Sequence, residues 1–142
     1  MASIKHMGSC HCGAVEFSVE ITGVFANLRR CNCTLCKRKG AVMASVPIGD
    51  LVIIRGADKL ASYQWNTRTA KHFFCSTCGI YTHHHQRRPP GMVGFNVACI
   101  EGVDPHSLGE IPISNGSEQS VVSDGVTPKS EPNKSLEQTR EG

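Results

Sequence analysis

Aromatic residues are scarce in this sequence. They account for 6% of its 142 residues, and only 39% of the residues are hydrophobic, while 14 are Gly and 7 are Pro. A chain of this length forms one domain of ordinary size, and this composition predicts a small core with many loops. Domains of that kind usually need disulfides or metal sites to hold them together, and the eight cysteines could serve either purpose.

Long apolar segments are also missing. The first six residues, MASIKH, contain no apolar leader, and no stretch approaches the length of about twenty residues that a membrane-spanning helix needs. We therefore expect a protein of the reducing cytoplasm with no membrane partner, in which cysteines bind metal rather than form disulfides. The net charge of +3 comes from short basic pairs and not from a basic stripe, so a nucleic-acid partner is not expected.

Three cysteines lie within six residues in the stretch CNCTLC, at Cys31, Cys33 and Cys36, which we expect to be a loop. Thiols this close along the chain do not easily pair with each other, because a disulfide needs separated Cα atoms and converging side chains. One divalent metal can bind all three. Zinc with three protein ligands keeps its fourth position open for water or substrate, which is typical of a catalytic site. The alternatives are a chance group of reduced surface thiols and a disulfide or redox pair.

Four further cysteines form two pairs that are far apart in the sequence. Each pair is followed by glycine, which lets the chain turn back with positive φ and direct amide groups at sulfur. Together the pairs would complete a closed four-sulfur zinc site that contributes folding free energy. An arrangement in which the central three cysteines borrow a ligand from a pair would leave one or two thiols unused. The pairs are Cys10 and Cys12, before Gly13, and Cys75 and Cys78, before Gly79.

Short apolar runs between turn residues predict a mostly β fold of short antiparallel strands, with little helical periodicity. Past residue 113 the composition changes to Ser, Asn, Gly, Glu and Pro with few apolar residues. We therefore assign the zinc-binding domain to residues 1–113 and predict that residues 114–142 are a disordered tail. The strands are expected at about 14–21, 25–28, 41–46, 51–54, 60–65, 72–74, 80–85 and 92–100.

Three other features have ordinary and functional interpretations. Cys99, on the apolar face of the last strand, is interpreted as a small buried hydrophobic residue, with a metal or reactive role as the alternative. In the run His83–His85 a strand directs only the first and third to one face, and we expect a polar rim or simple exposure rather than metal ligands. The run Lys37–Lys39 is expected to be solvated on a turn; otherwise it would offset the charge of a zinc tris-thiolate or hold an acidic substrate.

The cysteine motifs with their flanking residues resemble those of the glutathione-dependent formaldehyde-activating enzymes, which share their domain with centromere protein V. The segments that carry the resemblance are GSCHCGAV from residue 8, CNCTLC from residue 31, FCSTCG from residue 74 and NVACIEGV from residue 96. They extend over roughly residues 6–108. Asn32 stands where histidine is common in that family, which leaves the ligands unaffected. The resemblance implies an Mss4-like, or β-tent, fold with a structural zinc on Cys10, Cys12, Cys75 and Cys78 and a catalytic zinc on Cys31, Cys33 and Cys36.

The activity that the resemblance implies is that of a carbon-sulfur lyase, which forms or splits S-hydroxymethylglutathione. The chemistry agrees, because zinc lowers the pKa of a thiol at its open position and the thiolate adds to an aldehyde carbon without a redox cofactor. The leading hypothesis is therefore a zinc enzyme acting on a small thiol and an aldehyde. The alternatives are a non-catalytic zinc module that binds protein or nucleic acid, and metal storage or redox sensing. Basic candidates for anchoring glutathione are Arg29, Arg30, Lys37, Arg38, Lys71 and Arg87.

Overall fold

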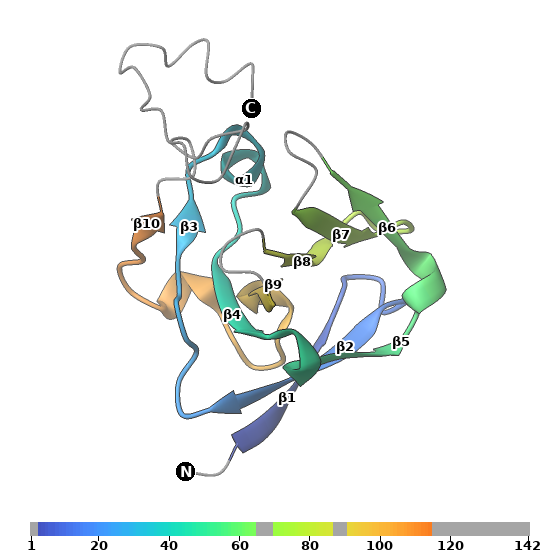
Figure 1. Ribbon diagram of the computed structural model, residues 1–142, viewed down its shortest axis with the longest axis horizontal. Coiled ribbons are helices and arrows are strands. Elements are labelled where there is room, and N and C mark those ends of the chain that lie inside the picture. Colours follow the sequence, from blue (N-terminus) through green and yellow to red (C-terminus); the bar gives the residue numbers. More distant parts are fainter. Residues whose placement is uncertain (1–2, 65–69, 87–90, 115–142) are drawn as a thin grey trace.

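The computed structural model describes residues 3–64, 70–86 and 91–114. In these ranges the chain consists mostly of short strands, arranged as a five-stranded sheet, a three-stranded sheet and a two-stranded pair (Figure 1). All neighbouring strands of the two larger sheets are antiparallel. The predicted mostly β fold of short antiparallel strands is confirmed.

The three-stranded sheet has the strand order β1-β2-β5. The apolar side chains of its middle strand, Phe17, Val19 and Ile21, are buried, and Ser18 between them is buried as well. A 3-10 turn at Ile48–Asp50 leads into the outer strand. The strands are β1 (Ser3–Ser9), β2 (Glu16–Thr22) and β5 (Leu51–Arg55).

The five-stranded sheet has the order β4-β9-β8-β7-β6. Its apolar side chains pack against those of the smaller sheet, so that Phe17 and Ile21 share one core with Ala44, Phe95 and Val97. A 3-10 turn at Ala57–Lys59 connects the two sheets between β5 and β6. The strands are β4 (Met43–Pro47), β6 (Leu60–Tyr63), β7 (Lys71–Cys75), β8 (Tyr81–His85) and β9 (Met92–Asn96).

One α-helix occurs in the described parts of the chain, and it lies where a loop was expected. This helix, α1 (Thr34–Lys39), begins at Cys33, whose Sγ accepts a hydrogen bond from the amide of Cys36, and ends at Gly40 with φ 67°. The loop prediction was wrong because cysteine is not among the usual N-cap residues; Gly40 was the available signal. No helix in these parts is long and apolar enough to cross a membrane.

Two predicted strands differ from the structure, and the end of a third lies outside the described residues. Residues 25–28 form bends and not a strand, and Asn27 adopts the left-handed conformation with φ 61°. The last long strand ends at Asn96, because its side chain accepts a hydrogen bond from the amide of Ala98 and starts the 3-10 turn Val97–Cys99. Trp65, predicted to end β6, lies outside the described residues.

Near its end the described chain returns to the central cysteine stretch. After a 3-10 turn at Pro105–Ser107, the short strand β10 (Ile113–Ser114) pairs in parallel with β3 (Arg30–Cys31). The strand β10 therefore spans the predicted domain boundary between residues 113 and 114. The remainder of the predicted tail, residues 115–142, lies outside the described residues.

Candidate metal centres

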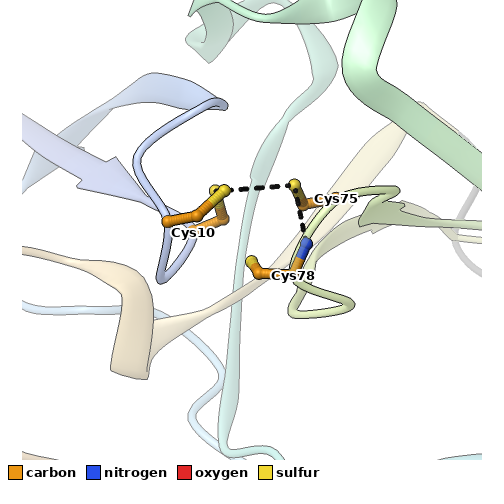
Figure 2. Close-up of side chains that lie close together, drawn as sticks. Cys10, Cys75 and Cys78 are labelled. Atoms are coloured by element: carbon orange, nitrogen blue, oxygen red, sulfur yellow. Dashed lines mark hydrogen bonds between the residues drawn. The ribbon is translucent and has the colours of Figure 1, made fainter.

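The two distant cysteine pairs meet at one place. Cys10 and Cys12 lie in the loop between β1 and β2, whereas Cys75 ends β7 and Cys78 lies in the turn before β8. The four sulfur atoms all lie within 4.8 Å of one another. In Figure 2 the side chains of Cys10, Cys75 and Cys78 converge from two separate loops. This four-cysteine cluster therefore joins the three-stranded sheet to the five-stranded sheet.

The spacing of these sulfurs suits a tetrahedral metal. The Sγ atoms of Cys10 and Cys12 are 3.7 Å apart, and those of Cys12 and Cys75 are 3.8 Å apart. Zinc-sulfur bonds of about 2.3 Å in a regular tetrahedron place neighbouring sulfurs about 3.8 Å apart. All eight cysteines of the chain are free thiols. The four-cysteine cluster thus fits one zinc ion with no open position.

Backbone amides support negative charge on the same sulfurs. The amide of Val15 donates to Cys10 Sγ at 3.3 Å, and the amide of Thr77 donates to Cys75 Sγ at 3.3 Å. The amides of Cys12 and Ile80 lower the pKa of the Cys78 thiol to about 6. Hydrogen bonds to sulfur favour the thiolate, which is the form that binds metal.

The glycines after each pair take the conformation that was expected of them. Gly13 and Gly79 have φ of 83° and 79°, in the left-handed region that other residues rarely adopt. Both loops can therefore fold back toward their own sulfurs.

The central stretch forms a second group, the three-cysteine cluster. Cys31 ends β3, Cys33 is the N-cap of α1 and Cys36 lies in its first turn, and their sulfurs lie within 4.8 Å of one another. All three side chains are partly exposed, whereas Cys10 and Cys75 in the other cluster are buried. Among the described residues no fourth Cys, His, Asp or Glu completes this group. Three sulfurs on the protein surface fit a metal with one open position.

The three thiols also share their protons. Hydrogen bonds from Cys33 and Cys36 strongly lower the pKa of Cys31, and the contact with Cys31 raises the pKa of Cys36. The group therefore forms one thiolate far more easily than three. A bound cation would favour all three thiolates, because it replaces the protons that the sulfurs otherwise share.

A set of polar side chains surrounds Lys39, which comes three residues after Cys36 in α1. The Nζ atom of Lys39 lies 3.0 Å from Nδ1 of His72 and 3.5 Å from the centre of the Tyr81 ring. The Tyr81 hydroxyl lies 2.6 Å from Nδ1 of His84, and the rings of His84 and His72 stack with centres 5.0 Å apart. We did not identify His72 and Tyr81 from the sequence, because only the pairing of β7 with β8 brings them to this place.

The structure corrects the expectation of an exposed or rim-forming histidine run. His83 and His84 are buried and His85 is partly buried. The predicted alternation holds, since His83 and His85 both contact the ring of Phe73, whereas His84 stacks on His72. Burial lowers the pKa of His83 to about 4 and that of His84 well below its usual value, so both rings are neutral at pH 7. In the described residues none of the three belongs to a metal-capable group.

The basic run divides into two kinds of residue. Lys37 and Arg38 are exposed, as expected of solvated charges, and within the described residues Arg38 donates to the carbonyl oxygen of Thr34 in its own helix. Lys39 is different, because it is partly buried against His72 and Tyr81. The helical turn of α1 gives Lys39 a partly buried position and leaves Lys37 and Arg38 exposed.

Cys99 belongs to neither cluster in the described structure. It is partly buried against the main core, and its Sγ donates to the carbonyl oxygen of Tyr81 at 3.6 Å. Burial raises the pKa of its thiol to about 12. These contacts agree with its interpretation as a small hydrophobic residue, although it lies in a 3-10 turn and not on a strand.

Comparison with known proteins agrees with this arrangement. The family description "glutathione-dependent formaldehyde-activating enzyme" matches residues 5–111. A Halomonas elongata protein, provisionally named as a glutathione-dependent formaldehyde-activating enzyme, is 32% identical over 79 residues. That match covers 50% of each chain, so this chain spans about half the length of that curated relative.

A crystal structure of a Rhodobacter sphaeroides protein has the same fold. It is 55% identical to this chain, and the two superimpose with a TM-score of 0.73 over 76% of this chain and 99% of the other. The likeness supports the predicted Mss4-like fold class. Since the family description covers most of the chain, including both cysteine clusters, the protein belongs to the glutathione-dependent formaldehyde-activating enzyme family.

Proposed function

We propose that the protein is a zinc-dependent carbon-sulfur lyase that forms or splits a thiol-aldehyde adduct, with S-(hydroxymethyl)glutathione as product or substrate. The family description and the name of the Halomonas relative support glutathione and formaldehyde as the reactants. The observation that carries the proposal is the three-cysteine cluster, whose sulfurs are together, partly exposed and without a fourth ligand in the described residues. A closed or buried group would give substrate no access.

The two clusters would hold zinc for different purposes. The four-cysteine cluster would hold a structural zinc, because its sulfurs have tetrahedral spacing and join two sheets. The three-cysteine cluster would hold the catalytic zinc. Zinc bound there would supply an open position at which the thiol substrate binds as a thiolate.

The reaction needs no oxidant or reductant. The thiolate sulfur forms a bond to the aldehyde carbon, and the electron pair of the carbonyl π bond moves to oxygen. The oxygen then takes up a proton equivalent to the one that the thiol released, which gives a neutral hemithioacetal. In the reverse direction the same carbon-sulfur bond breaks, and thiol and aldehyde separate.

The test counts metal and sulfur on protein purified without chelator. We expect two zinc ions per chain, and X-ray absorption should show that the mean number of sulfur ligands rises when glutathione is added. Exchange NMR on mixtures of glutathione and formaldehyde should show that the protein accelerates their interconversion with the adduct. Two zinc ions with an unchanged sulfur count and no acceleration would contradict the proposal and favour a non-catalytic zinc module.

Two single-thiol variants make the test specific. Cys36→Ser should lose one zinc and the acceleration, because the three-cysteine cluster would keep only two sulfurs. Cys99→Ser is the matched control, since it removes a partly buried thiol that belongs to neither cluster. Equal loss of activity in both variants would show that the effect comes from general damage.

A further inference from the structure

A row of four paired residues crosses strands β4, β9, β8 and β7 of the five-stranded sheet at one level. Ser45 pairs with Gly94, Gly94 with His84, and His84 with His72. Residues that are directly opposed on neighbouring strands lie on the same face of a sheet. Gly94 is needed in this row, because a Cβ atom there would collide with the imidazole of His84. The row is thus built so that two neutral histidines stack across the sheet.

Each end of the row binds a cation. At one end the Oγ atom of Ser45 accepts a hydrogen bond from Arg29 at 3.0 Å. At the other end His72 Nδ1 lies 3.0 Å from the ammonium of Lys39. Burial lowers the pKa of both cations, and this effect is opposed foremost by Tyr81 for Arg29 and by Cys36 for Lys39. The one ion pair in the described residues joins Arg55 to Glu16, so neither cation has a carboxylate partner there.

The two cations differ in the hydrogen bonds that they already make. The guanidinium of Arg29 donates to three protein oxygens, from Asn27, Ser45 and Gln86. An ammonium has three N–H donors, and in the described residues that of Lys39 has one acceptor, His72, and a place over the Tyr81 ring. Lys39 therefore keeps donor capacity for an oxygen atom that is not part of the protein.

The position of Lys39 relative to the cysteines follows from the helix. Lys39 comes three residues after Cys36 in α1, and side chains three apart are neighbours on a helix surface. The ammonium of Lys39 lies over the face of the Tyr81 ring, and the Tyr81 hydroxyl is hydrogen-bonded with Nδ1 of His84. The direction of the ammonium is thus set by the position of Lys39 in α1 and by its contacts with β7 and β8.

We propose that Lys39 is a catalytic residue whose ammonium donates a hydrogen bond to the substrate oxygen that becomes negative when a thiolate adds to the aldehyde. The proposal rests on the proposed function and assigns a role to a residue outside the metal clusters. As the carbon-sulfur bond forms, the π electron pair moves to oxygen and Lys39 stabilises the oxyanion. Lys39 stays protonated, and the oxygen receives its proton from solvent, to which the thiol released one. His72, Tyr81 and His84 are positioning residues.

A donor that is already oriented stabilises developing charge better than water does, because it does not have to reorganise. Loss of one such donor lowers kcat by about a hundredfold or more in enzymes with oxyanion holes. The same loss leaves substrate affinity nearly unchanged, because the charge on oxygen is absent before the reaction. Lys39 should therefore affect kcat and not KM.

The test compares Lys39 with an exposed lysine of β1. Lys39→Gln should lower kcat for glutathione and formaldehyde by about a hundredfold in exchange NMR, with KM and zinc content unchanged. Lys5→Gln is the control, because it removes the same charge from an exposed position outside both cysteine clusters. Lys39→Arg should recover part of the lost rate, since a guanidinium also donates. Lys39→Met provides a second removal of the charge if the Gln variant does not fold.

Each other outcome overturns the proposal. A raised KM with unchanged kcat would show that Lys39 anchors a carboxylate of glutathione. Equal rates for the Lys39→Gln and Lys5→Gln variants would show that the ammonium does not act on the reacting oxygen. A wild-type protein that gains a sulfur ligand from glutathione but does not accelerate exchange would contradict both this role and the lyase activity. Loss of zinc in Lys39→Gln alone would show that the residue serves metal retention instead.

Discussion

The two cysteine clusters contain the same kind of atom but differ in how the chain brings the atoms together. The four-cysteine cluster unites loops that are more than sixty residues apart, and two of its side chains are buried. The three-cysteine cluster comes from six consecutive residues, and all its side chains are partly exposed. Under the proposed function, loss of metal from the first would remove a link between the two sheets, whereas loss of metal from the second would leave that link in place. In our proposal, the same ligand chemistry therefore serves stability in one place and reactivity in the other.

The most direct way to break this comparison is to remove one sulfur from each cluster. Cys75→Ser should abolish folded protein, because structural zinc binding contributes about 10–16 kcal/mol in small zinc domains, as much as a whole domain is stable by. Cys33→Ser should keep the fold and lose one zinc. Serine is also a favoured N-cap, so the substitution preserves the start of α1. Circular dichroism and zinc analysis would check both, and equal loss of structure would refute the division of roles.

Two glycines allow a similar comparison without touching sulfur. A Cβ atom at Gly56 would collide with the backbone of Ala14, in the loop of the four-cysteine cluster, and its φ of 85° adds strain. Gly56→Ala should therefore lower the free energy of unfolding by about 3 kcal/mol or more. A Cβ atom at Gly94 meets only the side chain of His84, and Gly94→Ala should cost about 1–3 kcal/mol. Chemical denaturation measures the free energy of unfolding of both variants. A larger loss for Gly94→Ala than for Gly56→Ala would contradict the expected order.

Acid should act on the histidine that faces the core between the sheets. Burial first, and then the nearby charge of His85, lower the pKa of His83 to about 4 from an unfolded value near 6.5. Because the folded state favours the neutral ring, its contribution is present above about pH 6.5 and is lost as pH falls toward 4, by at most about 1.4 kcal/mol per pH unit.

A substitution isolates this contribution from protonation of the cysteines. His83→Phe keeps an aromatic ring stacked on Phe73, where the centres are now 4.6 Å apart. The difference in unfolding free energy between wild type and variant should change with pH only between about 6.5 and 4. If the unfolding free energies of wild type and variant changed in parallel over that range, the protonation of His83 would not be linked to unfolding.

The smallest effects are expected at the end of the described chain. Deleting residues 115–142 should change the free energy of unfolding by less than about 0.5 kcal/mol. Deleting Ile113 and Ser114 as well removes β10 and the hydrogen bond from the Asn32 amide to the Ser114 carbonyl oxygen at 3.1 Å, and should cost about 1 kcal/mol. For the longer deletion, zinc titration should show weaker binding at the three-cysteine cluster and unchanged binding at the four-cysteine cluster. A large drop in melting temperature for the shorter deletion would show that the tail packs on the domain.

What the sequence revealed depended on how far apart the contributing residues are. Local spacing and glycines identified all seven clustered cysteines, and the apolar run over 14–21 predicted β2. The strand β9 was predicted too long, because the side chain of Asn96 turns the backbone by a hydrogen bond that composition does not show. Lys39, His72 and Tyr81 could not be grouped in advance, since their contacts depend on strand register and on an unexpected helix.

The hydrogen bond from the Cys36 amide to Cys33 Sγ has a practical consequence. The Cys33 sulfur both caps the start of α1 and belongs to the three-cysteine cluster, so the start of the helix and the cluster share one atom. The chemical shift and exchange rate of that one amide proton would therefore respond when a metal or a substrate thiol alters the charge on the sulfur. The chain carries its own spectroscopic probe at the place where chemistry is proposed to occur.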